Sequence, residues 1–284
     1  MEYKKIKLDL DYKKLGLEDT DCYPSLECYL PDRELYSEMG DDQRLSQAIL
    51  ILPGGGYGFT SAREHEVIAY QFLAAGFCAF SLRYSVSPAV FPQALYEVYS
   101  AIAMIRKNAE EWHIDKNKIA VCGFSAGGHL AASAGAFWNE DFVKTDLGFT
   151  CEHKPNALIL SYPVITAGEY AHRGSFLNLL GKEDVTEEEI KYFSIENRVT
   201  KDFPPSFIWH TAADDAVPVM NSLLLGEALA KNKIKFEMHI YPEGRHGLSL
   251  SNSITATANE LCPTKPQAWV RDSIGFLLED AYKN

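Results

Sequence analysis

Residues 118–137, KIAVCGFSAGGHLAASAGAF, place Ser125 between two segments with different patterns. Residues 119–123 are apolar and are typical of a strand that is buried on both faces. From Gly128 onward the residues are small and favour a helix. Glycines stand two positions before and two positions after the serine. The stretch therefore predicts a tight turn from a core strand into a helix, with the serine hydroxyl exposed at the corner.

The alternation of strand and helix continues along most of the chain. Continuous apolar runs predict strands at residues 48–53, 77–84, 118–124, 157–164, 204–212 and 234–242. Segments with helical spacing accompany them at residues 63–76, 91–112, 125–137, 217–232 and 267–283. Apolar strands that alternate with helices indicate a mostly parallel central sheet with helices on both faces. We therefore predict one α/β domain that spans residues 1–284.

Two segments break this alternation. Residues 1–46 contain short β-like pieces and polar turns, and we expect them to form N-terminal edge strands. Residues 163–202 form an insertion after a central strand, in which Thr186 is the expected N-cap of an acidic helical turn. Ligands of open α/β sheets bind at the carboxyl ends of the strands, so we expect this loop and helix to lie over the site. A plain surface excursion with one amphipathic helix is the alternative.

Charge and hydropathy exclude several classes of partner. The 284-residue chain has a formal net charge of −12 and no basic stripe to meet phosphates, which argues against nucleic acid. No apolar run approaches the roughly 18 residues of a membrane helix, so no membrane partner is expected. The N-terminal residues also lack the apolar stretch and cleavage site of an export signal.

The cysteines show no CxxC motif and no metal-ligand spacing. Cys78 and Cys122 lie inside apolar strand-like runs, where a thiol usually acts as a small apolar side chain. We therefore expect reduced cysteines and a cytoplasmic location. The six cysteines are Cys22, Cys28, Cys78, Cys122, Cys151 and Cys262.

The pentapeptide Gly123–Gly127 is a G-x-S-x-G motif. In such a turn the serine adopts a strained backbone conformation, and the strand and helix approach so closely that the positions two away must be small. The N-terminus of the following helix carries a partial positive charge that favours a developing oxyanion. We interpret Ser125 as a nucleophile; a glycine-rich turn that happens to contain serine is the alternative.

A nucleophilic serine needs a base, and an acidic residue must orient that base. On this type of sheet the order along the chain is serine, acid, histidine. His246 lies in a glycine-flanked loop directly after the strand at 234–242, which places it at a carboxyl end of the sheet. The other seven histidines fit surface or core positions better. Among them, His129 lies one helical turn beyond Ser125 and cannot easily reach its Oγ.

The acid is expected after another late strand. Asp214 and Asp215 both follow the strand at 204–212, and the local sequence leaves the choice between them open. The aspartate that does not orient the base is expected to be a solvated turn residue or a helix cap.

Acyl transfer also needs hydrogen-bond donors for the oxyanion. The glycine-rich loop at 53–56 follows the first strong core strand and offers backbone N–H groups without obstructing side chains. By its order along the chain, this loop supplies one half of an oxyanion hole, and Ala126, directly after the serine, supplies the other half. The loop does not match G-x-x-x-x-G-K-[ST], so no nucleotide is implied.

A family resemblance is carried by four motifs: Pro53–Tyr57, Gly123–Ala131, Asp214–Pro218 and His246–Gly247. Together they resemble the α/β-hydrolase superfamily, in particular its esterase/lipase branch with bacterial acetyl esterases and acetylxylan esterases. The resemblance implies Asp214, four residues before Pro218, as the acid. It also implies Gly55 and Gly56 as oxyanion donors together with Ala126. Many relatives have histidine where this chain has Pro53, so the support of the loop must differ.

The motifs predict a serine carboxylesterase that acts through an acyl-enzyme. The expected roles are nucleophile for Ser125, base for His246 and orienting acid for Asp214. The expected substrate is a small-molecule ester with a short acyl group, such as acetyl on a sugar or xylo-oligosaccharide, because no long hydrophobic lid is present. No metal or cofactor is expected. The main alternative is an amide-cleaving hydrolase of the same fold, similar to an arylformamidase or a peptidase; a non-catalytic binding protein is less favoured, because the chain keeps all three triad residues.

Several aromatic residues near the motifs would suit either stacking on a sugar or ordinary packing. Packing is the preferred interpretation for Tyr162 and Trp209. The residues in question are Tyr57, Phe59, Tyr84, Phe124, Tyr162 and Trp209. The apolar side chains of the closing helix at 267–283 could pack internally or pair subunits, so a homo-oligomer stays open.

Overall fold

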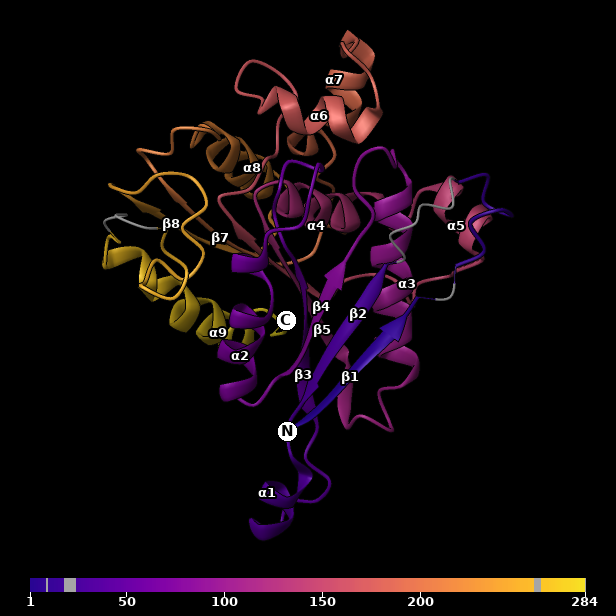
Figure 1. Ribbon diagram of the computed structural model, residues 1–284, viewed down its shortest axis with the longest axis vertical. Coiled ribbons are helices and arrows are strands. Elements are labelled where there is room, and N and C mark those ends of the chain that lie inside the picture. The colour runs from indigo at the N-terminus through magenta and orange to yellow at the C-terminus, as the bar shows by residue number, and fades with distance from the viewer. Residues whose placement is uncertain (9, 18–23, 258–261, 284) are drawn as a thin grey trace.

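The computed structural model describes residues 1–8, 10–17, 24–257 and 262–283 of the chain. Within these residues, strands assemble in the order β1-β2-β4-β3-β5-β6-β7-β8 (Figure 1). From β4 to β8 all neighbours run parallel, whereas β2 is antiparallel to both β1 and β4. This confirms the predicted α/β class and the mostly parallel sheet. The strands are β1 (Glu2–Lys7), β2 (Ser25–Leu30), β3 (Ser46–Leu52), β4 (Cys78–Arg83), β5 (Ile114–Phe124), β6 (Ala157–Ser161), β7 (Ser206–Thr211) and β8 (Phe236–Tyr241).

Helices cover both faces of the sheet (Figure 1). The α-helices are α1 (Arg33–Glu38), α2 (Glu66–Ala74), α3 (Gln93–Lys107), α4 (Ala126–Phe137), α5 (Asp141–Leu147), α6 (Arg173–Leu180), α7 (Glu187–Phe193), α8 (Met220–Lys231) and α9 (Trp269–Glu279). Short 3₁₀ turns are η1 (Ala62–Glu64), η2 (Ile195–Asn197) and η3 (Lys265–Ala268).

The apolar residues of each central strand alternate between two cores. In β3, Leu50 belongs to the core formed with α3, α4 and α8, whereas Ile49 and Ile51 belong to the core formed with α2 and α9. All three side chains are fully buried. Because successive side chains of a strand point to opposite faces, a strand between two helical layers must be apolar at every position. This explains the continuous apolar runs of the sequence.

Several boundaries differ from the prediction. The helix predicted to run to residue 112 ends as α3 at Lys107, and the chain turns there so that Trp112 packs against Phe80, with ring centroids 5.5 Å apart. β5 then begins at Ile114, earlier than expected, beside Ser46. The helices α1 and α5 were not predicted, because six or seven residues are too few for a periodic pattern to emerge.

The segment 163–202 contains α6, α7 and η2. α6 and α7 lie together beyond α4 at one end of the molecule (Figure 1). The predicted N-cap is confirmed: the Thr186 hydroxyl accepts a hydrogen bond from the Glu189 backbone N–H, and Glu189 accepts one in return from the N–H of Thr186. This reciprocal capping box starts α7 where the acidic run begins.

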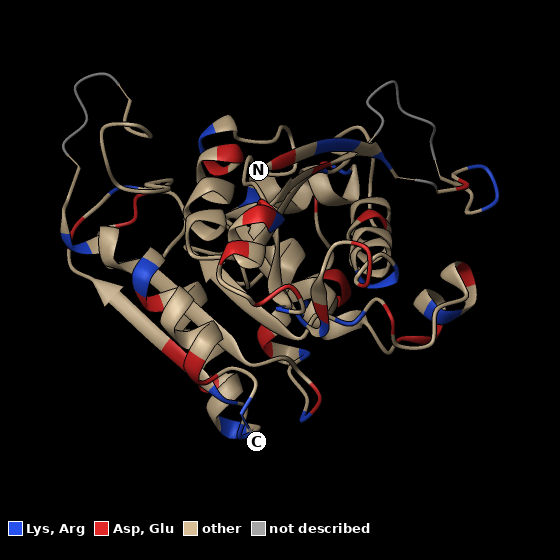
Figure 2. Cartoon of the chain, turned by 90° about the horizontal axis from the view of Figure 1, so that it is seen from below, with Lys and Arg blue, Asp and Glu red and all other residues tan. Residues whose placement is uncertain are grey.

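Acidic and basic residues are interspersed along the chain (Figure 2). No helix among the described residues combines the length and the hydropathy needed to cross a membrane. Cys78 and Cys122 are buried in the core as expected, and neither they nor the other described cysteines form a disulfide; Cys22 lies outside the described residues. In α9, Trp269, Phe276 and Leu277 pack internally.

Candidate active site

The backbone around Ser125 is a strained turn with no room for larger neighbours. β5 ends at Phe124, α4 begins at Ala126, and Ser125 between them has φ 54° and ψ −119°. A Cβ on Gly123 would lie 2.2 Å from the carbonyl oxygen of Gly127. A Cβ on Gly127 would lie 2.2 Å from the carbonyl oxygen of Leu52. Both glycines of the motif are therefore required by backbone contacts, as the sequence pattern predicts.

Ser125, His246 and Asp214 form a continuous hydrogen-bonded chain. Ser125 Oγ lies 2.8 Å from His246 Nε2, and His246 Nδ1 lies 2.8 Å from Asp214 Oδ2. The Asp214 side chain is 1% exposed and the His246 side chain 20% exposed. A carboxylate only accepts hydrogen bonds, so the imidazole proton belongs on Nδ1 and Nε2 is free to accept from the serine hydroxyl.

The two candidate aspartates contact His246 in different ways. Asp214 contacts the imidazole, whereas Oδ1 of the exposed Asp215 accepts a hydrogen bond of 3.0 Å from the backbone N–H of His246. Asp214 therefore orients the ring and Asp215 holds the loop that carries it. The aspartate that the family spacing implies, Asp214, is the one that lies against the imidazole.

A second histidine contacts the same carboxyl oxygen of Asp214 as His246 does. His210, fully buried in β7, places Nε2 3.2 Å from Asp214 Oδ2 and 3.0 Å from the carbonyl oxygen of Val217. Its Nδ1 lies 2.7 Å from Ser222 Oγ. The sequence-based interpretation treated His210 as an ordinary strand residue. The signal that could have identified it is a polar side chain in an apolar strand, four residues before the acid.

These contacts shift the acidity of Asp214. Burial alone would raise the pKa of this carboxyl, but hydrogen bonds from His210 and His246 and the N–H of Val217 lower it below its ordinary value. The carboxylate thus stays ionised near neutral pH although its side chain is buried. This is the state in which it can orient an imidazole and stabilise its protonated form.

The glycine-rich loop packs directly against the serine turn. A Cβ on Gly54 would lie 2.9 Å from Ser125 Cβ, so only glycine fits. Within the described residues, no backbone hydrogen bond uses the N–H of Gly55, Gly56 or Ala126. These are the three N–H groups that the family resemblance implies as oxyanion donors. None of them is engaged by another backbone group in the described part of the chain.

Three side chains support this loop where many relatives use a histidine. The Tyr84 hydroxyl donates 2.6 Å to the carbonyl oxygen of Pro53, and Asn178 of α6 donates 2.9 Å to that of Gly56. The third support is Glu64, which accepts 2.8 Å from the N–H of Gly54. The insertion thus contacts the loop through α6. Neither Glu64 nor Asn178 was identified from the sequence, because each contacts the loop from a different element, η1 for Glu64 and α6 for Asn178.

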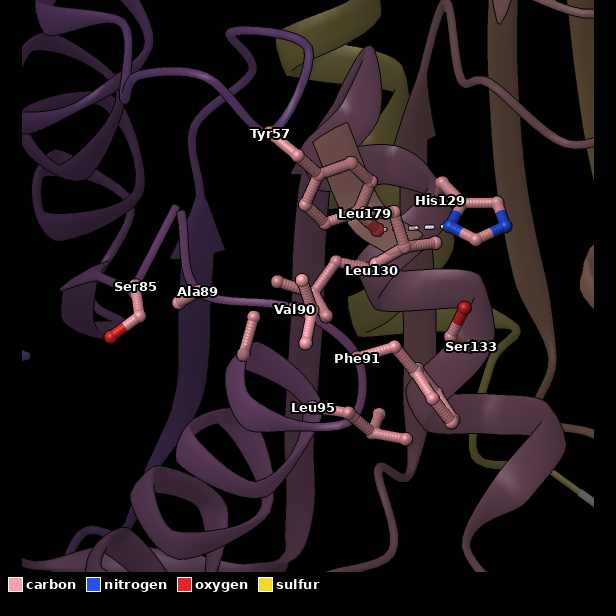
Figure 3. A pocket seen from close by; sticks show the side chains of 11 residues that line it. Tyr57, Ser85, Ala89, Val90, Phe91, Leu95, His129, Leu130, Ser133 and Leu179 are labelled. Carbon is pink, nitrogen blue, oxygen red and sulfur yellow. Dashed lines mark hydrogen bonds between the residues drawn. The ribbon is translucent and has the colours of Figure 1, made fainter. Parts of the chain in front are cut away.

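Both ring nitrogens of His129 contact groups other than Ser125 Oγ, and Figure 3 shows the contact with Tyr57. Its Nδ1 lies 2.9 Å from the Tyr57 hydroxyl and its Nε2 3.0 Å from the carbonyl oxygen of Phe193. Burial lowers the pKa of His129 to about 4, so it is neutral at pH 7. The adjoining cavity has a volume of about 10 Å³, room for one water, and it is lined by Tyr57, Ser85, Ala89, Val90, Phe91, Ala94, Leu95, His129, Leu130, Ser133 and Leu179.

The aromatic residues near the motifs divide sharply by exposure. Tyr162 and Trp209 are buried in the core, as expected, and so are Tyr57, Tyr84 and Phe124. Phe59 is 63% exposed, at the end of the glycine-rich loop. Of these six rings only that of Phe59 is exposed to solvent. Among the described residues, no group of three or more His, Cys, Asp or Glu side chains is arranged to hold a metal ion.

The BD-FAE family model matches residues 34–229, which include the glycine-rich loop, the serine turn and both aspartates. The chain belongs to the BD-FAE family. It is 38% identical over 222 residues to "Endo-1,4-beta-xylanase B" of Butyrivibrio fibrisolvens, covering 77% of this chain and 35% of that protein. It is 30% identical over 238 residues to "Acetylxylan esterase" of Xylanibacter ruminicola, covering 82% and 45%.

Among solved structures, this BD-FAE chain resembles an acetyl ester-xyloside bifunctional hydrolase from Caldicellulosiruptor lactoaceticus. The two share 32% identity with a TM-score of 0.82, over 99% of this chain and 97% of the other. The chain spans less than half the length of the two curated relatives but nearly all of this structure. Fold and family resemblance therefore agree on an α/β hydrolase.

Proposed function

We propose that this BD-FAE protein is a serine carboxylesterase that removes short acyl groups, in particular acetyl, from sugars or xylo-oligosaccharides. The observation that carries the proposal is the hydrogen-bonded chain Ser125–His246–Asp214, beside available backbone N–H groups. Relatives named as an acetylxylan esterase and an acetyl ester-xyloside hydrolase support ester chemistry on xylan-derived substrates. The exposed ring of Phe59 supports a carbohydrate, because the apolar face of a sugar stacks well on an aromatic ring.

In the first half-reaction, Ser125 Oγ attacks the ester carbonyl carbon while His246 Nε2 takes the hydroxyl proton. The carbonyl oxygen becomes an oxyanion that accepts hydrogen bonds from the backbone N–H groups of Ala126, Gly55 and Gly56. Each such donor contributes on the order of 3 kcal/mol in comparable sites. His246 then gives its proton to the departing alcohol oxygen, which leaves an acyl group on Ser125.

In the second half-reaction, a water molecule repeats the same sequence. The water attacks the acyl carbon while His246 accepts one of its protons. His246 then gives this proton to Ser125 Oγ as the bond to the acyl group breaks and the carboxylic acid leaves. Asp214 stabilises the imidazolium in both halves without taking the proton itself. Because His210 and the N–H of Val217 keep Asp214 ionised, this support persists through the cycle.

Hydrolysis of p-nitrophenyl esters from acetyl to decanoyl, run beside Ser125→Ala, tests the proposal. We expect turnover to be fastest with acetyl, to fall with chain length and to drop about 10⁶-fold in kcat without the nucleophile. Acetylated xylo-oligosaccharides then test the sugar preference, with Phe59→Ala as the variant expected to raise KM selectively for them. A folded protein without activity on any ester would contradict the proposal and favour amide substrates or a binding role.

A further inference from the structure

The 3₁₀ turn η1 joins the two loops that build the candidate site. Its last residue, Glu64, is 3% exposed, and each of its carboxyl oxygens accepts one hydrogen bond. Oε2 accepts 2.8 Å from the backbone N–H of Gly54, and Oε1 accepts 2.5 Å from the hydroxyl of Tyr162. One buried carboxyl is thus connected both to the glycine-rich loop and to the residue that follows β6.

The second arm of this connection ends at the loop of His246. The Tyr162 hydroxyl accepts 2.9 Å from the backbone N–H of Ser249, and its ring packs edge-on against the His246 imidazole, with centroids 5.1 Å apart. Burial, together with the Glu64 carboxylate, raises the pKa of Tyr162 well above its ordinary value. The phenol therefore stays protonated and donates to Glu64 while it accepts from Ser249.

The neighbouring residue of η1 reinforces the same junction. The Ser249 hydroxyl donates 2.5 Å to the carbonyl oxygen of Arg63, and Arg63 Nη1 donates 2.8 Å to the carbonyl oxygen of Thr255. Ser249 and Thr255, the two partners of Arg63 in these hydrogen bonds, both belong to the segment that follows His246. The turn therefore fixes the distance between the glycine-rich loop and the histidine loop through several independent hydrogen bonds.

We propose that Glu64 is a positioning residue that sets the oxyanion donors and His246 in register around Ser125; this inference rests on the esterase function proposed above. By accepting from the N–H of Gly54, Glu64 turns that peptide inward and leaves the next two N–H groups facing the reacting carbonyl. Through Tyr162, the same carboxyl holds the imidazole. Glu64 touches neither substrate nor reacting atom, and it acts through the groups that do.

A carboxylate is required because two donors converge on Glu64. The amide of glutamine offers one acceptor oxygen. Its NH₂ group would therefore face either the Gly54 N–H, which breaks that contact, or the Tyr162 hydroxyl, whose proton then loses its acceptor. Aspartate is one methylene too short to reach both partners. Glu64→Gln therefore keeps the shape of the side chain and removes only the double acceptor.

The test compares Glu64→Gln with wild type in p-nitrophenyl acetate hydrolysis and in binding of phenylboronic acid, which forms a tetrahedral adduct on an active serine. We expect kcat/KM to fall about 10- to 100-fold, mostly in kcat, since a misplacement of about 1 Å can cost about 100-fold. Boronate affinity should fall by a similar factor, because the adduct uses the same oxyanion donors. Amide hydrogen exchange of the 52–61 segment should rise without substrate present.

Glu97→Gln is the matched control. Glu97 is also fully buried and also accepts from a backbone N–H, that of Ser85, and from a tyrosine hydroxyl, that of Tyr12. We expect this variant to lower stability while kcat/KM stays within about 2-fold of wild type. A second variant, Tyr162→Phe, should give a partial loss that is not additive with Glu64→Gln.

Two outcomes overturn the role of Glu64. In the first, the wild type is active and Glu64→Gln has the same kcat/KM. In the second, Glu64→Gln turns over more slowly but binds the boronate as tightly as the wild type, which places the effect outside the oxyanion loop. Absence of both ester turnover and boronate binding in the wild type would instead overturn the proposed function. Hydrogen exchange separates the cases, because it reports the Glu64 contact to Gly54 whether or not the protein hydrolyses esters.

Discussion

The serine turn and the loops that carry Asp214 and His246 are held by different forces. Around Ser125, backbone atoms of neighbouring segments are in direct contact, and an added Cβ would come within 2.2 Å of a carbonyl oxygen. Beyond the ends of β7 and β8, Asp214 and His246 are held to each other by a hydrogen bond between residues far apart in sequence. The first region is specified by the absence of side chains, and the second by the presence of particular ones.

This difference explains why the serine turn can be recognised from a short stretch of sequence and the contacts of the two loops cannot. A steric requirement at fixed offsets leaves a short motif, G-x-S-x-G, that any single sequence displays. The hydrogen bonds that Asp215 and Glu64 accept leave no such motif, because the N–H groups that donate them lie in other loops. Substitutions in the two regions should therefore fail in different ways: loss of folding stability in the turn, and loss of turnover in the loops.

The largest effect is expected from the acid. Asp214→Asn should lower kcat about 10⁴-fold, because an amide in place of the carboxylate favours the wrong imidazole tautomer. The isosteric change Asp215→Asn keeps an oxygen for the N–H of His246 and should change kcat less than about 3-fold. Steady-state kinetics on p-nitrophenyl acetate measures both. Equal losses in the two variants would contradict the division of labour between the adjacent aspartates.

A glycine substitution tests the turn. Gly127→Ala should lower the free energy of unfolding by about 3 kcal/mol, because its Cβ would collide with the Leu52 backbone and neither segment can retreat from the core. Gly275→Ala in α9 is the matched helical control. Its Cβ meets nothing within 4 Å, and the change should add about 0.5–1 kcal/mol through helix propensity. Urea unfolding followed by circular dichroism measures both; a stable Gly127→Ala protein would remove the steric explanation of the motif.

The pH dependence of stability tests the burial of neutral His129. With a folded-state pKa of about 4 and an ordinary value near 6.5, His129 binds a proton more readily when the chain is unfolded. The contribution of this group to the free energy of unfolding is thus complete above pH 6.5. It falls by about 2 kcal/mol by pH 5 and levels off below pH 4. His129→Gln should lose less stability than wild type between pH 7.5 and 5 in urea titrations. Parallel curves for the two proteins would show that His129 does not titrate in this way.

The smallest effect is expected at His210. Its replacement by phenylalanine removes one donor to Asp214 and should lower kcat/KM about 10-fold, the size of one charged hydrogen bond. His210→Gln can still donate to Asp214 and should recover most of the loss. The measurement is kcat/KM of both variants, under conditions in which the same fraction of each protein is folded. No recovery by glutamine would mean that His210 serves packing alone.

The predictions from sequence succeeded where one segment carries its own constraint. The apolar runs identified the parallel sheet, Thr186 started a helix as predicted, and the cysteines Cys78 and Cys122 proved to be core residues. The predicted end of the helix at residues 91–112 was wrong. Residues 108–112 have helical composition, but the chain leaves the helix after Lys107 and Trp112 packs against Phe80. Local propensity loses there to a tertiary contact.

The sequence by itself determined the fold class and the serine turn, since continuous apolar runs and glycines at fixed offsets from the serine are both visible within single short segments. It also ordered the candidates for acid and base, but it could not choose between Asp214 and Asp215 without a family resemblance. Only the tertiary structure assigned the partners of His210, Glu64 and Asn178. Each of these pairs joins groups from different elements, and the direction and distance of a hydrogen bond are defined only once those elements are packed.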